Sequence, residues 1–233
     1  MLQRNFYILC LVIGGLSIAS FAQRSQSIPT EVNLAPKANL VSTDAISTAN
    51  EKGKVTAVFA GGCFWGMEAV FENLKGVSNV VSGYSGGSAK TANYERVSTG
   101  QTEHAESIKV TFDPSQISYE QLLQVYFYVA HDPTQLNRQG PDRGAQYRSA
   151  IFFANAEQKQ IAESYIDRLN KSRKFATPIV TQLVPLQSFY LAEDYHQDFI
   201  VHNPNYPYVV AHDLPKLAQL QKQFPEMLSS SAK

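Results

Sequence analysis

Cysteine is scarce in this sequence, which contains only Cys10 and Cys63 among its 233 residues. A disulfide-rich scaffold is therefore excluded, and the five histidines show no spacing typical of a metal site. The sequence also lacks an excess of positive or negative charge, because its 20 Lys and Arg residues balance its 20 Asp and Glu residues. Nothing in the charge predicts nucleic acid or an anionic membrane as a partner. With 44% hydrophobic and 17% charged residues, the composition is that of a globular protein.

A long apolar run occurs at the N-terminus, from Phe6 to Ala19, after Arg4. It is shorter than the roughly 20 residues that span a bilayer. Ser20-Phe21-Ala22 follows, with the small-x-small pattern of a signal-peptidase site. We interpret residues 1–22 as a cleaved secretory signal peptide and expect a periplasmic or extracellular protein. An uncleaved membrane anchor is the alternative, and Leu9 before Cys10 argues against a lipoprotein signal.

The rest of the chain divides into a spacer and one domain. Residues 23–53 are rich in Ser, Thr, Ala, Asn and Gln, without hydrophobic periodicity, which is typical of a flexible linker. Residues 54–233 form the expected catalytic domain. After signal cleavage Cys63 is the single cysteine, and an unpaired cysteine in an exported protein is a candidate reactive thiol. The alternative is a buried, inert side chain.

Strand and helix patterns alternate along this domain. Period-two or apolar segments predict strands over 55–60, 77–84, 108–112, 150–154 and 179–186. Helical spacing predicts helices over 63–74, 118–129, 155–169, 190–201 and 214–224, two of them with capping pairs, Ser118 with Gln121 and Asn155 with Gln158. We expect an α+β two-layer sandwich, a mixed sheet covered by helices with a ferredoxin-like core and a long irregular C-terminal segment. The loops over 86–106 and 132–148 are long enough to carry function.

Cys63 follows a predicted strand and Gly61-Gly62, at the first turn of a predicted helix. Free backbone N–H groups and the helix dipole favour an anion there. A thiol with a pKa of ~8.5 is roughly 3% ionised at pH 7. A helix terminus contributes only about 0.3–1 kcal/mol, less than one pKa unit. The helix alone therefore leaves Cys63 mostly protonated.

Gly62-Cys63-Phe64-Trp65-Gly66 resembles the signature of the A-type peptide methionine sulfoxide reductases. Further blocks are similar to that family in the same order between residues 55 and 208. They are Gly83-Tyr84-Ser85-Gly86-Gly87, Asn93-Tyr94, the segments 100–106, 131–135, 140–144 and 146–149, and Phe189-Tyr190 to Gln197.

The resemblance implies a reaction in which the Cys63 thiolate attacks the sulfur of methionine-S-sulfoxide, free or in proteins. It implies that Glu106 gives a proton to the departing oxygen, that Tyr94 and Tyr147 hydrogen-bond this oxygen, and that Asp142 orients the loop or a water. Phe64 and Trp65 are then the pocket for the S-methyl group. Methionine leaves and Cys63 becomes a sulfenic acid, a repair reaction for oxidised proteins under oxidative stress. We expect the thiolate and the neutral acid to coexist chiefly when sulfoxide is bound.

Many relatives carry a resolving cysteine near the C-terminus, but no cysteine follows Cys63 here. The resemblance to a single-cysteine type implies reduction by an external thiol. This is a thioredoxin-like or glutaredoxin-like protein, with dithiothreitol as a substitute in vitro. We expect no cofactor, no metal and a monomer.

Three other functions fit parts of the sequence. A one-cysteine peroxidase shares the sulfenic acid but needs no methyl pocket. A non-catalytic module that binds oxidised peptides would tolerate loss of the Cys63 thiol. A thiol hydrolase would require a histidine base, for which His104 is the candidate. His196 is interpreted as a packing or hydrogen-bonding residue, and Phe64 and Trp65 have the alternative of being core aromatics.

Overall fold

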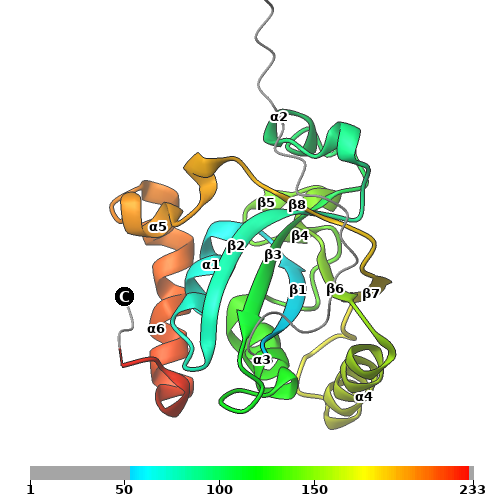
Figure 1. The fold of residues 1–233 in the computed structure, drawn as a ribbon, viewed down its shortest axis with the longest axis vertical. Coiled ribbons are helices and arrows are strands. Elements are labelled where there is room, and N and C mark those ends of the chain that lie inside the picture. The colour runs from blue at the N-terminus through cyan, green and yellow to red at the C-terminus, as the bar shows by residue number, and fades with distance from the viewer. Residues whose placement is uncertain (1–52, 231–233) are drawn as a thin grey trace, which may run out of the picture. The chain divides into compact units, whose positions relative to one another are not determined.

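The computed structural model describes residues 53–230 (Figure 1). The predicted signal peptide, and the spacer except for its last residue, lie outside the described residues. Within residues 53–230, no helix has the length and apolar character that a membrane crossing requires.

The domain is built on one large sheet whose strands follow the order β7-β6-β1-β3-β2-β8. All neighbouring strands are antiparallel except β6 and β7, which are parallel. The strands are β1 (Val55–Gly61), β2 (Val77–Ser85), β3 (Ala105–Phe112), β6 (Ser149–Phe153), β7 (Gln182–Pro185) and β8 (Phe189–Leu191).

The four central strands and two helices have ferredoxin-like connectivity. Helix α1 (Phe64–Glu72) joins β1 to β2, and helix α3 (Tyr119–Val125), continued by a π-helical turn over Tyr126–Ala130, leads from β3 towards β6. This gives the chain order β-α-β-β-α-β with the spatial order β6-β1-β3-β2. The predicted α+β fold, a mixed sheet with helices packed on it, is confirmed.

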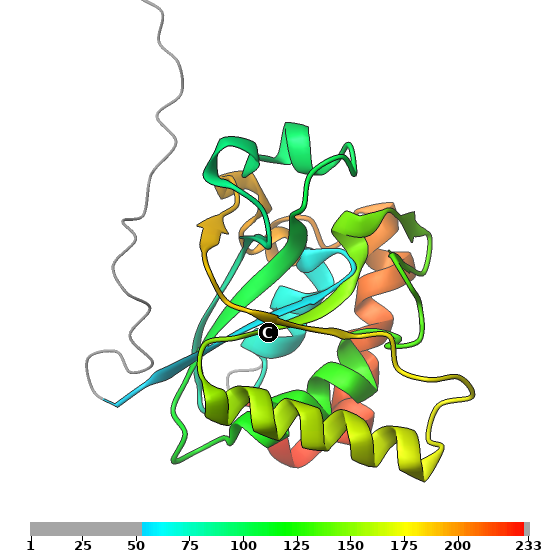
Figure 2. The same cartoon turned by 90° about the vertical axis from the view of Figure 1, so that its right-hand side faces the viewer.

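The sheet must curl strongly, because its two edge strands are joined by a very short connection. Strands β7 and β8 lie at opposite edges, yet only residues 186–188 separate them. Six flat strands would span about 24 Å, whereas this connection reaches about 14 Å at most. Figures 1 and 2 show the connection crossing one face of the sheet. Its Leu186 and the following Phe189 pack there against a buried cluster that includes Val58 and Phe152.

The helices cover the other face of the sheet, where the main core lies. Phe59 of β1 stacks on Phe71 of α1 and on Tyr126, with ring centroids 5.5 and 5.1 Å apart, and all three are fully buried. Burial of side chains of this size stabilises the fold by about 1.5–3 kcal/mol each. The two remaining long helices are α4 (Ala156–Ser172) and α6 (Leu214–Gln223).

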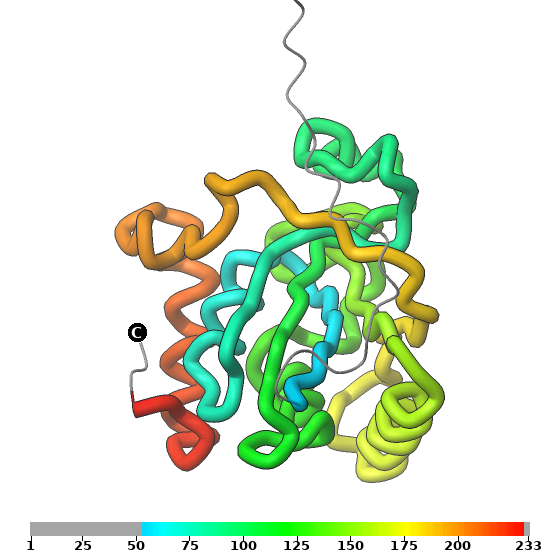
Figure 3. The backbone as a smooth tube through the Cα atoms, viewed as in Figure 1, coloured from blue at the N-terminus to red at the C-terminus, as the bar shows by residue number. Residues whose placement is uncertain are grey.

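The C-terminal segment returns to the first helix. After β8 the chain forms a 3₁₀ turn over Asp194–His196 and helix α5 (Phe199–His202), then a π-helical turn over Val209–Asp213 that leads into α6. Figure 3 follows this path to α6 beside α1. The end of the chain is held there by two backbone bonds, Lys75 N–H to Met227 O at 2.8 Å and Ser229 N–H to Asn73 O at 2.9 Å.

Several local predictions agree with the structure and one is wrong. The capping pair at Ser118 is complete, and the Asn155 side chain accepts from the Gln158 N–H at 2.8 Å. The single helix predicted over 190–201 is not formed: residues 189–191 pair with Gly83–Ser85 as strand β8, and helical structure is limited to the 3₁₀ turn over Asp194–His196 and helix α5. The loop over 132–148 contains a small hairpin, β4 (Arg138–Gln139) with β5 (Asp142–Arg143), and a 3₁₀ turn over Ala145–Tyr147. Helix α2 (Tyr94–Val97) lies within the other long loop.

Candidate active site

Cys63 lies between the end of β1 and the first turn of α1, where it is the N-cap residue. The preceding Gly62 has a φ of +96°, which residues with side chains rarely adopt. A β-carbon at Gly62 would also lie 2.6 Å from the side chain of Gln139. A residue other than glycine would therefore change the path of the chain just before the thiol.

The thiol is nearly buried, with 8% of the residue exposed. Burial is the largest cause that raises the pKa of Cys63 well above its ordinary value, and the nearby carboxyl groups of Glu106 and Asp213 add to it. The backbone N–H of Trp65 and the ammonium of Lys216 oppose this rise. In the substrate-free site Cys63 is therefore a thiol, in agreement with the small contribution expected from a helix terminus.

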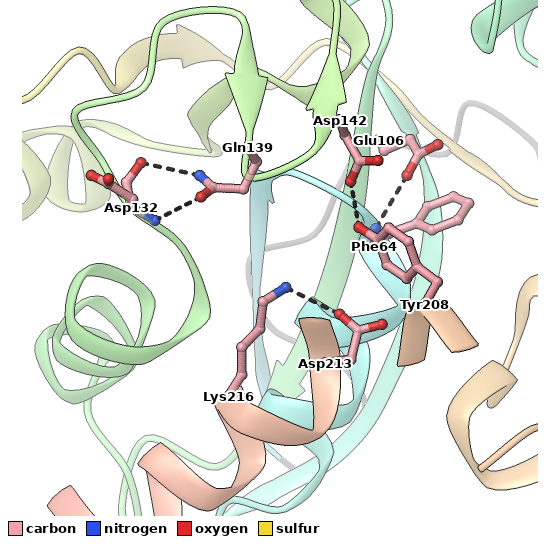
Figure 4. A network of polar contacts seen from close by, with 8 residues as sticks. All are labelled: Phe64, Glu106, Asp132, Gln139, Asp142, Tyr208, Asp213 and Lys216. Carbon is pink, nitrogen blue, oxygen red and sulfur yellow. Dashed lines mark hydrogen bonds and ion pairs between the residues drawn. The ribbon is translucent and has the colours of Figure 1, made fainter. Parts of the chain in front are cut away.

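Glu106 enters the site from β3 and is 2% exposed. Its Oε2 accepts the backbone N–H of Phe64 at 3.2 Å, which places the carboxyl group against the first turn of α1 (Figure 4). Burial raises the pKa of Glu106 to about 8, the Phe64 N–H lowers it, and the charge of Asp142 raises it. At neutral pH this side chain is mainly a neutral acid beside a thiol.

A cavity of about 180 Å³ opens onto these two groups. All seven side chains singled out from the sequence line this one cavity. Two further tyrosines join them at its wall. The lining residues are Cys63, Phe64, Trp65, Tyr94, Glu106, Asp142, Tyr147, Tyr206 and Tyr208.

Tyr94 and Tyr147 contribute hydroxyl groups to the cavity. Burial raises the pKa of both, and the charge of Glu106 adds to the rise, so both remain protonated donors at neutral pH. Tyr94 is held by its backbone, whose N–H donates to Glu193 Oε1 at 2.8 Å. The other oxygen of Glu193 accepts from the Tyr84 hydroxyl at 2.8 Å. Glu193 thus joins the loop that carries Tyr94 to strand β2.

Trp65 forms an aromatic wall of the cavity. Its ring stacks on Phe199 with centroids 3.6 Å apart and an interplanar angle of 5°. Tyr206 and Tyr208 meet it edge-on, at 87° and 85°. The indole N–H donates to His196 Nδ1 at 3.1 Å, so the hydrogen-bonding role interpreted for His196 agrees with the structure. The position of the indole is therefore fixed on several sides.

Asp142 faces the cavity from the small hairpin and accepts a hydrogen bond from the Tyr208 hydroxyl (Figure 4). This contact joins the loop over 132–148 to the C-terminal segment across the site. His104, in contrast, lies elsewhere: its Nε2 is 2.9 Å from the Ser88 carbonyl, and it does not line the cavity. No histidine among the described residues lines this cavity, so the base that a thiol hydrolase needs is not in place.

Sequence reasoning missed Glu193, Tyr206 and Tyr208. Both tyrosines lie in or just after the segment 203–206, which has no regular structure, so no periodicity marks them. The signal that could have found Glu193 was its place inside one of the similarity blocks. Among residues 53–230, no group of three or more His, Cys, Asp or Glu side chains is arranged to hold a metal ion.

The fold and the site define a class of protein. The single cysteine of residues 53–230 and a buried acid with a raised pKa share one small aromatic cavity on a ferredoxin-like sheet, and this arrangement suits a thiol oxidoreductase.

Comparison with known proteins gives the family. Residues 55–228 match the family model of peptide methionine sulfoxide reductase. The reductase MsrA 2 of Mesorhizobium japonicum is 59% identical over 177 residues, which cover 76% of this chain and 91% of that protein. MsrA 2 of Synechocystis is 50% identical over 224 residues, 96% of this chain and 99% of that protein. The crystal structure of Mxr1 from Saccharomyces cerevisiae in reduced form matches with a TM-score of 0.61 at 31% identity, over 68% of this chain and 90% of that one.

The chain belongs to the peptide methionine sulfoxide reductase family. It is an oxidoreductase that reduces methionine sulfoxide at the expense of thiols.

Proposed function

We propose that Cys63 reduces methionine-S-sulfoxide, free or in oxidised proteins, and that the other cavity residues bind the substrate and protonate its oxygen. The observation that carries the proposal is that a thiol and a neutral acid lie on one cavity with an aromatic wall. A sulfoxide needs these three features, because its sulfur accepts a nucleophile, its oxygen accepts a proton and its methyl group is apolar.

Substrate binding uses the two sides of the cavity. The S-methyl group packs against Phe64 and Trp65, whose position is fixed by its bond to His196 and its stack on Phe199. The sulfoxide oxygen points to Glu106 and to the hydroxyls of Tyr94 and Tyr147, which donate hydrogen bonds as negative charge develops on it. Asp142 holds Tyr208, and thereby the C-terminal segment, against the mouth of the cavity.

Bond making and proton transfer are coupled. The sulfur of Cys63 attacks the sulfoxide sulfur as its own proton leaves, while Glu106 protonates the oxygen. An ionised Glu106 would raise the pKa of the thiol, so proton transfer from Glu106 to substrate must accompany or follow the attack. The net conversion takes one thiol and one sulfoxide to one sulfenic acid and one methionine.

The sulfenic acid is then reduced from outside the chain. Cys10 lies in the proposed signal peptide and no cysteine of the printed sequence follows Cys63, which supports attack on its sulfur by an external thiol through the same cavity. Two thiols of a thioredoxin-like or glutaredoxin-like protein, or of dithiothreitol, regenerate Cys63 and leave as a disulfide with one water. The signal-like N-terminus supports export, so we place this donor, the oxidised substrates and a monomeric enzyme in the periplasm or outside the cell.

A racemic methionine sulfoxide peptide tests the proposal. With dithiothreitol as donor, we expect the enzyme to consume half of the peptide and then stop, because one epimer is left. The Cys63→Ser variant should consume none. Full consumption, or unchanged consumption by Cys63→Ser, would show that the reaction is not the one proposed.

A further inference from the structure

A buried ion pair lies beside the first turn of α1, outside the set of residues that line the cavity. Asp213 ends the π-helical turn and Lys216 lies three residues later in α6, with Oδ1 and Nζ 3.2 Å apart. Asp213 has no exposed surface. Its Oδ2 has no hydrogen-bond partner in the described part of the chain. A fully buried carboxylate with one oxygen that lacks a hydrogen bond costs folding free energy, so we expect a functional reason for its position.

The contact with α1 is made at Gly66. A β-carbon at this position would lie 2.2 Å from Asp213 Oδ1 and 2.8 Å from Lys216 Nζ. The glycine that closes the Gly62–Gly66 motif thus makes room for the ion pair, one helical turn from Cys63. The Lys216 side chain is only 17% exposed, so it does not lie on a solvated face of the helix.

The charges that face Cys63 come from every element around it. Carboxyl groups approach from β3, from the small hairpin and from the π-helical turn. Tyrosine hydroxyls approach from helix α2, from the 3₁₀ turn over Ala145–Tyr147 and from the C-terminal segment. In this set of described residues, Lys216 is the single cation. The set consists of Glu106, Asp142, Asp213, Tyr94, Tyr147, Tyr208 and Lys216.

We infer that Asp213 and Lys216 are positioning residues that set the reactivity of the Cys63 sulfur by holding one cation and one anion against the first turn of α1. This inference rests on the proposed role of Cys63 as nucleophile. Lys216 favours the thiolate, whereas Asp213 opposes it and holds the ammonium group in place. Their charges act in these directions, since Asp213 raises and Lys216 lowers the pKa of Cys63.

The test is the pH dependence of Cys63 alkylation by iodoacetamide in the full chain. Mass spectrometry of the peptide that contains Cys63 separates its labelling from that of Cys10. We expect Lys216→Met to slow alkylation about three- to tenfold at pH 7 and to move the profile to higher pH. Asp213→Asn should accelerate it by a similar factor. Lys222→Met, which removes the same charge from an exposed position of the same helix, should leave the profile unchanged.

Opposite shifts distinguish this role from a purely structural one. If the pair only held α6 in place, both variants would loosen the site and both would increase alkylation. Shifts in the same direction, or unchanged profiles in both variants, would overturn the inference. Turnover of the unmodified chain with dithiothreitol, measured in parallel, reports on the proposed function separately.

Gly66→Ala gives an independent second variant. Alanine is a better helix former than glycine, so local propensity alone predicts a more stable α1 with the same thiol. The clash with Asp213 predicts a displaced ion pair and an alkylation profile that differs from that of the unmodified chain. A stabilised variant with an unchanged profile would contradict the inference.

Discussion

Replacement of Glu106 by Gln isolates the proton that this side chain supplies. The amide keeps the shape of the side chain, and its carbonyl can still accept the Phe64 N–H. With a pKa of about 8, Glu106 is about 90% protonated at pH 7. At an ordinary pKa of 4.5 it would be about 0.3% protonated at that pH. Burial therefore increases the supply of neutral acid about 300-fold.

Loss of a positioned general acid typically slows a reaction about 10²- to 10⁴-fold. We expect a decrease of this size in the rate of the first turnover, measured as methionine formed in rapid-quench experiments without reductant. The unmodified chain should also lose rate above about pH 8, where Glu106 ionises. This descending limb should vanish in Glu106→Gln.

Glu103→Gln is the matched control, because Glu103 is an exposed carboxyl group just before the same strand. Its rate and its pH profile should equal those of the unmodified chain. A Glu106→Gln variant that keeps the full rate would refute the assignment of Glu106 as the acid. So would a descending limb that persists without the carboxyl group.

Three further predictions concern the scaffold of the site. Gly62→Ala should lower the free energy of unfolding about 3 kcal/mol more than Gly140→Ala. Both glycines have positive φ, but only the first meets the Gln139 side chain, and denaturant titration compares them. Glu68 is buried with a pKa raised from 4.5 to about 8, so its carboxyl group lowers stability as pH rises between these values. The advantage of Glu68→Gln over the unmodified chain should therefore grow by up to about 4 kcal/mol across this range, and a constant advantage would contradict it. Trp65→Phe keeps an aromatic ring but loses the hydrogen bond to His196, so KM for a sulfoxide peptide should rise about fivefold. An unchanged KM would show that this N–H does not help to position the ring.

The position of Cys63 could be predicted from local sequence. Strand periodicity ends at two glycines, helical periodicity begins directly afterwards, and both elements are found with Cys63 at their junction. Capping at Ser118 was equally local. Such features depend on a few neighbouring residues, so one sequence contains the information for them.

The burial of Glu106 could not be predicted in this way. At the entry of a predicted strand, a carboxylate has the ready interpretation of a solvated charge. In the structure Glu106 lies on an inner strand of a curled sheet, opposite Tyr84 in register, and is closed off from solvent. The curl follows from the short connection between β7 and β8, two strands at opposite edges of the sheet. Such a long-range constraint leaves no local pattern.

The contacts of the C-terminal segment were hidden for the same reason. Tyr208 reaches Asp142 across 66 positions, and His196 reaches Trp65 across 131 positions. The family resemblance identified seven side chains that line the cavity, but it did not identify the residues that hold them. The burial of Lys216 is a further example, because nothing near it in the sequence indicates the space that Gly66 leaves.

The role of Cys63 is tested most directly by a single turnover without reductant, in the presence of dimedone, which traps sulfenic acids. We expect about one methionine per chain and a dimedone adduct on the peptide that contains Cys63. The Cys63→Ser variant should give neither. Methionine formation by that variant, or a full turnover that leaves Cys63 unlabelled, would contradict the claim that this sulfur takes the oxygen.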